Sequence, residues 1–351
     1  MSMDKALLRK VAEYTLAQAH AYTDDTANTK DLKRWHRWDW SIGVGLYGVL
    51  KANKILQDEQ IYQSVKDWID ARLDKIPSIC VNTCGVMPAV LEIAEKYGFD
   101  AYEEVINTFD DYVMHKAIKT PCGAIAHSVI GSELPGEIWA DTLFMCALYM
   151  AKRGKMLNNV DMLAEAGKQL YLHVEKLFHA DKGLFYHGYD DINGKEMGTL
   201  WGRGNAWVTV ATVEIFDTIG AEFSSDAAQI KQDVLKKVST QLDALLTYQL
   251  PNGMWATVID HPNDTYEESS ITAGTVYGVL RGCELGYFDA KHVPMAQKAV
   301  GALNANINAD GGVEKGSTGT PIKADVAAYN EIHYFVTPFT QGLALMALCA
   351  E

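Results

Sequence analysis

The sequence predicts an all-α protein in which six helical hairpins close into an (α/α)6 barrel. Six nearly all-apolar segments, most of them opening at a small residue, alternate along the 351 residues with six amphipathic segments that carry a charged face. The strict apolar–polar alternation of a half-buried strand is rare in this chain. Helices that are apolar all round are buried and helices with one charged face lie outside, so the alternation indicates an inner and an outer ring.

The six apolar segments are the expected inner helices. They begin at Gly43, Gly85, Trp139, Gly204, Thr272 and Gln341. The first segment also matches the glycine pattern of dinucleotide-binding turns, but that pattern works only between a strand and a helix. Because the pattern lies inside a helical run, we expect its glycines to allow close helix packing.

The six amphipathic segments are the expected outer helices, at residues 4–20, 59–75, 100–116, 159–177, 226–250 and 292–307. An open α-solenoid would alternate in a similar way, but its repeats are short and uniform. The hairpins here vary in length and are joined by long aromatic loops, which favours a closed barrel whose loops form a concave mouth. No Pro- or Ser-rich linker interrupts the chain, so we expect residues 1–351 to form a single catalytic domain.

Composition excludes several functional classes. With 31 Lys+Arg against 45 Asp+Glu, the formal net charge of −14 disfavours a nucleic-acid partner. The N-terminal segment is amphipathic, unlike a signal peptide, and no run approaches the roughly 18 apolar residues that span a bilayer, so we expect a cytoplasmic protein that makes no membrane contact. The six cysteines and ten histidines show no metal-ligand or disulfide spacing, so we expect no metal and no cofactor.

Chemically active side chains gather where loops meet the expected inner helices. Trp139 and Asp141 open the third inner helix, His187 precedes the fourth, and Arg203 and Trp207 open the fourth. Tryptophan and tyrosine in such positions are the side chains that stack on sugar rings, because they offer a flat apolar face and a polar edge. The pattern indicates a carbohydrate site.

Two of these residues have a structural alternative. Asp141 could cap the helix, or it could be a carboxyl beside Trp139 that desolvation pushes toward the neutral acid, able to donate a proton. Arg203 could be a structural anchor, or it could use the room between two glycines to clamp a carboxylate with its planar fork.

Four segments resemble the motifs of the unsaturated rhamnogalacturonyl hydrolases of glycoside hydrolase family 105: GEIWADTLFMCALYMAKRG, LFYHGYDD, WGRGNAWVTVATVE and EESSITAG. The resemblance implies an (α/α)6 barrel, no metal, and an exolytic enzyme. Such an enzyme removes a 4,5-unsaturated uronic acid from the non-reducing end of short pectin-derived oligosaccharides. In the chemistry that it implies, an aspartate protonates the double bond, water adds at carbon 5, and the resulting hemiketal collapses.

The resemblance also implies roles for single residues. Asp141 matches the acid/base, and the substrate contacts are expected at Trp139, His187, Arg203, Trp207, Trp40 and His127. Asn82 stands where relatives frequently show an acidic residue, which leaves the identity of the leaving sugar open.

The number of carboxylates separates the possible reactions. A saturated glycoside needs two carboxylates across its bond, whereas a vinyl ether needs one acid that afterwards deprotonates water. Besides Asp141, only Asp39 and Glu268 suggest themselves as partners. Three alternatives stay open: an unsaturated glucuronyl hydrolase acting on glycosaminoglycan fragments, an inverting glycosidase on the same barrel, and a non-catalytic sugar-binding helical scaffold.

Overall fold

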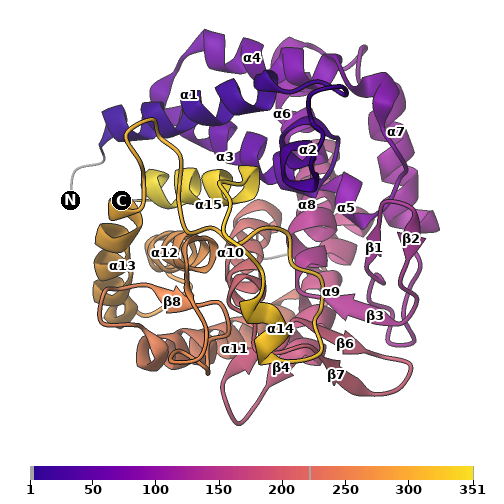
Figure 1. Cartoon of the computed structure of the whole chain (residues 1–351). Helices are drawn as coiled ribbons and strands as arrows, with labels where there is room; N and C mark the ends of the chain where they lie inside the picture. The colour runs from indigo at the N-terminus through magenta and orange to yellow at the C-terminus, as the bar shows by residue number, and fades with distance from the viewer. Residues whose placement is uncertain (1–3, 221–222, 351) are drawn as a thin grey trace.

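Two concentric rings of helices make up the protein, whose structure is a computed structural model that describes residues 4–220 and 223–350 (Figure 1). The inner ring contains α3 (Trp40–Leu56), α6 (Met87–Tyr97), α8 (Leu148–Leu157), α10 (Gly202–Ile219), α12 (Ser269–Glu284) and α15 (Pro338–Cys349). The outer ring contains α1 (Lys5–Ala21), α4 (Glu59–Asp70), α7 (Glu103–Asp111), α9 (Val160–Leu177), α11 (Ala227–Tyr248) and α13 (Val293–Ala305). Neighbouring inner helices pack in chain order and α15 packs back on α3, so the predicted (α/α)6 barrel is confirmed.

Glycines let α3 approach its neighbours closely. A Cβ atom on Gly48 would lie less than 3.0 Å from the backbone of Gly342 in α15, and one on Gly43 would lie equally close to the backbone of Gly85. Any larger residue would push these helices apart. The packing role expected for the glycine pattern is thereby confirmed.

Two inner helices, α3 and α12, begin earlier than the small residues suggest, because polar caps precede those residues. Asp39 caps α3 by accepting the N–H of Trp40, and Glu268 caps α12 by accepting the N–H of Ile271. The predicted starts at Gly43 and Thr272 were therefore late.

Short antiparallel strands lie in the segments that lead from an outer helix to the next inner helix, and several short helices interrupt the connections. The strands are β1 (Ser128–Val129), β2 (Ser132–Glu133), β3 (Glu137–Trp139), β4 (Phe178–His179), β5 (Leu184–Phe185), β6 (Gly188–Asp190), β7 (Lys195–Met197), β8 (Trp255–Ala256) and β9 (Glu267–Glu268). The short helices are α2 (Lys30–His36), α5 (Val81–Cys84), α14 (Val326–Asn330), the 3-10 turns η1 (Leu73–Lys75) and η4 (Ala290–His292), and the π-helices η2 (Tyr112–Lys116) and η3 (Leu143–Ala147). Trp139 was expected to open a helix, but its main chain pairs with β6, so it ends a strand.

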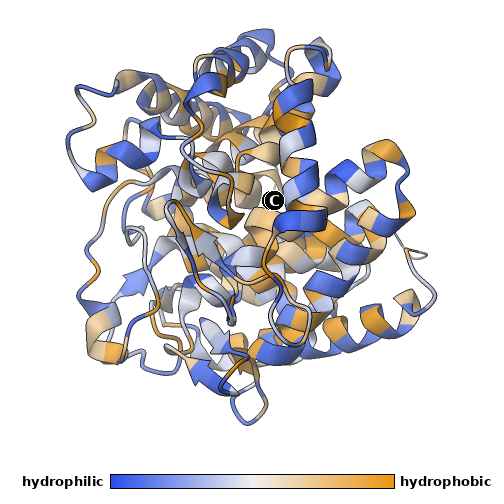
Figure 2. Ribbon diagram, turned by 90° about the vertical axis from the view of Figure 1, so that its right-hand side faces the viewer, coloured by the Kyte–Doolittle hydropathy of each residue, from blue (hydrophilic) through white to orange (hydrophobic). Residues whose placement is uncertain are grey.

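Apolar residues are concentrated in the inner ring, whereas the outer helices alternate polar and apolar faces (Figure 2). The segment that joins α13 to α15, including α14, crosses the face of the ring (Figure 1). In the ranges that the structure describes, no helix is both long and apolar enough to cross a membrane.

Candidate active site

Asp141 lies at the junction between β3 and the third inner helix. Trp139 pairs with Gly188 across β3 and β6, and the N–H of Ala140 donates to the carbonyl of His187 at 3.0 Å, which fixes the position of the next residue. The π-helix η3 follows directly, and such π-turns are frequent at functional sites. Asp141 is 7% exposed and its Oδ2 has no hydrogen-bond partner among the described residues, which does not support a capping role.

His187 connects Asp141 to a residue far along the chain. Its Nε2 lies 3.4 Å from Oδ2 of Asp141, and its Nδ1 lies 2.6 Å from the hydroxyl of Tyr329 in α14. A 3.4 Å separation is long for a hydrogen bond, so the two groups are close without being firmly paired. Burial lowers the pKa of His187 and keeps the ring neutral, and a hydroxyl that donates to Nδ1 leaves the ring proton on Nε2, facing Asp141.

The protonation of Asp141 differs from the expectation. Burial raises the pKa of Asp141, but the interaction with His187 and the nearby His127 and Arg203 lower it, and the lowering prevails. The prediction of a neutral acid is therefore wrong for the protein without substrate, in which the carboxyl is ionised near neutral pH. A bound substrate carboxylate would place a like charge beside Asp141 and raise its pKa.

His127 supports the ring of Trp139. The two rings stack with centroids 4.4 Å apart and an interplanar angle of 5°. His127 is also held by Thr142, whose hydroxyl lies 2.9 Å from its Nδ1, and the indole N–H of Trp139 donates to Glu137 at 2.7 Å. His127 thus covers one face of the Trp139 ring and holds that ring in position.

Trp40 and Trp207 belong to an aromatic cluster within the ring. Trp40 stacks on Phe339 at 4.7 Å and meets Trp207 edge to face at 6.3 Å, and Trp207 packs 5.1 Å from Phe144. Trp207 has no exposed surface, so this structure does not offer its ring to a sugar. We expected a substrate contact there, and the geometry gives Trp207 a supporting position below Trp40.

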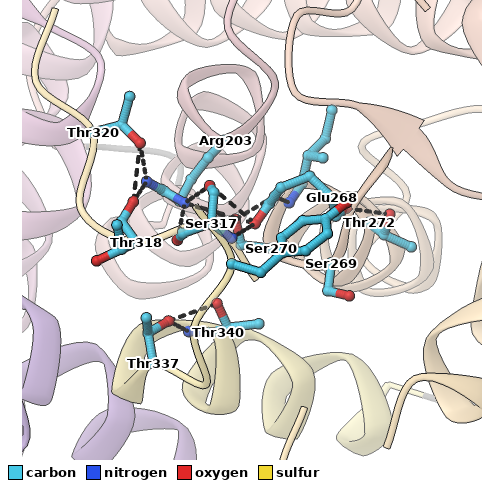
Figure 3. Close-up of polar contacts among 12 residues, drawn as sticks. Arg203, Glu268, Ser269, Ser270, Thr272, Ser317, Thr318, Thr320, Thr337 and Thr340 are labelled. Atoms are coloured by element: carbon cyan, nitrogen blue, oxygen red, sulfur yellow. Dashed lines mark hydrogen bonds and ion pairs between the residues drawn. The ribbon is translucent and has the colours of Figure 1, made fainter. Parts of the chain in front are cut away.

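The structure contradicts the expected free fork of Arg203 (Figure 3). Its Nη1 donates to the hydroxyl of Ser317 at 2.8 Å, and its Nη2 donates to the carbonyl of Thr318 and the hydroxyl of Thr320, both at 3.0 Å. Because the protein itself occupies the fork, Arg203 anchors the crossing segment to α10. Within the described part of the chain only its buried Nε lacks a partner.

Glu268 and Asp39, the two other carboxylates considered as partners of Asp141, differ in how far the protein already occupies them. Glu268 accepts the N–H groups of Ile271 and Ser317 and lies 3.7 Å from Nη1 of Arg203, so it is engaged in structure and is not a free partner for Asp141. Burial raises the pKa of Asp39 to about 6. Asp39 is therefore the remaining candidate for a second carboxyl group.

Sequence reasoning missed two neighbours of His187. The ring of Trp201 lies 3.9 Å from that of His187, and Tyr329 binds its Nδ1. Trp201 stands in the quoted WGRGNAW motif and could have been chosen from it. Tyr329 comes from a segment without periodic pattern, 142 residues from His187, and offered no such signal.

We expect Tyr329→Phe to lower kcat about tenfold while the fold is kept, because the change removes only the hydroxyl that orients His187. Steady-state kinetics with circular dichroism would test this. Tyr334→Phe, on the exposed neighbour in the same segment, is the matched control. Equal kinetics for Tyr329→Phe and the wild type would remove Tyr329 from the site.

No group of three or more His, Cys, Asp or Glu side chains in residues 4–220 and 223–350 is arranged to hold a metal ion.

Comparisons with known proteins find relatives that match nearly the whole chain. The unsaturated rhamnogalacturonyl hydrolase YesR of Bacillus subtilis is 29% identical over 316 residues, which cover 89% of this chain and 88% of the relative. A solved structure from Salmonella enterica, described as a possible member of family GH105, superposes with a TM-score of 0.89 at 25% identity and covers 100% of this chain and 94% of its own. A second possible GH105 member, from Klebsiella pneumoniae, gives a TM-score of 0.88 at 28% identity, with 98% and 91% covered.

The resemblance derived from the sequence motifs is thus confirmed. A family model described as Glycosyl Hydrolase Family 88 matches residues 9–350, nearly the whole chain. The chain belongs to glycosyl hydrolase family 88 and is a glycosidase.

Proposed function

We propose that the protein removes a 4,5-unsaturated uronic acid from the non-reducing end of short rhamnogalacturonan-derived oligosaccharides. The observation that carries the proposal is the buried Asp141, whose Oδ2 has no hydrogen-bond partner among the described residues and lies 3.4 Å from Nε2 of His187. A single acid of this kind suits a vinyl ether, which needs protonation once and no opposing nucleophile. The similarity to an unsaturated rhamnogalacturonyl hydrolase supports the same reaction.

The proposed chemistry begins with proton transfer from the Asp141 carboxyl to carbon 4 of the double bond. Water then adds at carbon 5, and Asp141, now ionised, takes the proton that this water loses. The hemiketal at carbon 5 then opens by breaking its bond to the ring oxygen, which takes the proton of the carbon 5 hydroxyl and leaves carbon 1 as a hemiacetal of the leaving sugar. The hemiacetal hydroxyl gives its proton to the leaving oxygen as the bond from carbon 1 to the leaving sugar breaks, so an aldehyde remains and the sugar departs as an alcohol. Neutral His187 holds its Nε2 proton beside Asp141 and stabilises the carboxylate between the two proton transfers.

A panel of unsaturated disaccharides tests the proposal. Turnover is followed as the loss of the ultraviolet absorbance of the conjugated enol ether. We expect the rhamnose-linked unsaturated uronate to be the best substrate and its saturated analogue to be untouched. Preferred turnover of a glycosaminoglycan-derived disaccharide would favour the glucuronyl alternative, and cleavage of the saturated analogue would favour a two-carboxylate glycosidase.

The value of kcat/KM should fall as pH rises. Because the pKa of Asp141 lies below its ordinary value in the free protein, the protonated acid becomes scarcer as pH rises. We expect kcat/KM to fall between about pH 5 and about pH 8, the range in which proteins are usually stable, with a slope approaching −1 on logarithmic axes. A flat profile for the wild type would contradict this assignment.

We also propose that the chain is a single catalytic domain that acts in the cytoplasm. The packing of α15 on α3 supports one domain, since the first and the sixth inner helices close the same ring. All six cysteines are unpaired, as is typical of proteins in a reducing compartment.

A further inference from the structure

A small cavity lies at the end of the inner ring opposite to Asp141, where α3, α8 and α10 end. It has a volume of about 210 Å³ and is lined by Lys54, Pro88, Leu91, Glu92, Glu95, Lys152, Lys155, Met156 and Thr218. Lys152 lies on α8, about three turns of helix and 16 Å along the axis beyond Asp141. The cavity is therefore separate from the proposed active site, and the mechanism uses none of its residues.

The amine of Lys152 has no polar partner. The side chain is half-buried, and its Nζ lies 5.0 Å from the centre of the Tyr47 ring. Within residues 4–220 and 223–350 this Nζ forms no hydrogen bond and no ion pair. The amine is therefore free to react with a molecule that enters the cavity.

Glu214, a buried carboxylate close to this amine, is already satisfied by other donors. Its Oε1 accepts from Nζ of Lys51 at 2.6 Å. The hydroxyl groups of Tyr47 and Tyr277 donate to the same carboxylate. Because three donors hold Glu214, its carboxylate does not pair with Lys152.

The surroundings of Lys152 favour its uncharged form. Burial lowers the pKa of the Lys152 amine, and the ammonium groups of Lys51 and Lys54 lower it further. The carboxylates of Glu214 and Glu92 act in the opposite direction, but each is paired with one of those two lysines, and the lowering prevails. A larger share of this amine is thus uncharged at neutral pH than of an exposed lysine, and an uncharged amine is the form that attacks carbonyl groups.

We propose that Lys152 is a modification site at which small aldehydes form an imine inside this cavity. The amine nitrogen attacks the carbonyl carbon, a proton moves from nitrogen to oxygen, and the hydroxyl so formed leaves as water while the carbon–nitrogen double bond forms. Nothing is oxidised or reduced, so the step needs no further reagent. It does not involve Asp141 and is independent of the proposed function.

The test measures how fast the lysines of the intact protein react with acetaldehyde. Cyanoborohydride reduces each imine to a stable ethyl-lysine, which mass spectrometry of peptides quantifies. At about pH 7 we expect Lys152 to be labelled at least threefold faster than Lys155, an exposed lysine on the same helix, because less of its amine is protonated. At about pH 10, near the ordinary pKa of lysine, this advantage should disappear. Equal or slower labelling of Lys152 at neutral pH would overturn the proposal.

A bulky aldehyde and one variant complete the test. Periodate-oxidised dextran carries aldehydes on a polymer too large for a cavity of about 210 Å³, so it should label Lys155 and leave Lys152 unmodified. Equal labelling of both by the polymer would show that the cavity does not enclose the amine and would refute the site. Lys152→Arg keeps the positive charge but lacks the nucleophile, so the fast labelling by acetaldehyde should be lost while kcat changes less than about twofold. Fast labelling that persists in this variant would assign the reaction to another lysine.

Discussion

Asp141→Asn should reduce kcat by about 10²- to 10⁴-fold while the protein remains folded. The amide matches the carboxylate in size but supplies no acidic proton, and no hydrogen bond of Oδ2 to the described residues is lost by the change. Because the loss falls on the chemical step, KM should change little in comparison with kcat. Absorbance kinetics on the unsaturated disaccharide and circular dichroism provide the two measurements.

Two further variants make the result specific to Asp141. Asp161→Asn, on the exposed first turn of outer helix α9, controls for the loss of one negative charge and should leave kcat unchanged. Asp39→Asn probes the other candidate carboxyl, whose pKa is raised to about 6 by burial. If Asp39→Asn abolishes turnover while Asp141→Asn retains it, the proton comes from Asp39 and the assignment of Asp141 is refuted.

Arg203→Met should lower the free energy of unfolding by about 3–5 kcal/mol, the usual cost of removing one partner from a buried ion pair. The change leaves Glu268 buried without its cation at 3.7 Å, and it removes the donors that hold Ser317 and Thr318. Urea denaturation followed by fluorescence would measure the loss. We also expect kcat/KM to fall, because the same segment carries Tyr329 against His187.

The matched variant for this experiment is Arg153→Met. Arg153 pairs with Asp110 at 2.9 Å, and both side chains keep some exposure, so water can replace the lost partner. Its loss of stability should be clearly smaller than that of Arg203→Met. If both variants lose a similar free energy of unfolding, Arg203 contributes no more to stability than an ordinary ion pair and does not anchor the crossing segment.

The architecture could be predicted because hydrophobic periodicity reports directly on burial. The expected outer segment 4–20 corresponds to α1 (Lys5–Ala21), and the segment 159–177 to α9 (Val160–Leu177), with Asp4 and Asn159 as their N-caps. The start of the third inner helix was misplaced at Trp139, because strand pairing between β3 and β6 is a long-range contact that leaves no local pattern.

The site was predictable only in part, for a related reason. Motifs identify residues that meet at the mouth, so Asp141, His187 and Trp139 could be grouped before any coordinates were known. Whether a group is free or already paired depends on partners distant in sequence. Arg203 finds its partners in the segment 317–320, more than a hundred residues away, and its local neighbours gave no sign of them.

Closure of the ring by α15 also governs when this protein can fold during synthesis. The face of α3 that carries Gly48 packs on Gly342 in α15, so the first inner helix keeps apolar surface exposed until α15 has been synthesised. Contacts between distant parts of a chain form slowly, and exposed apolar surface promotes aggregation in the meantime. A nascent chain that does not yet include α15 would therefore expose this apolar surface to aggregation, and rapid synthesis of the segment between α3 and α15 shortens that exposure.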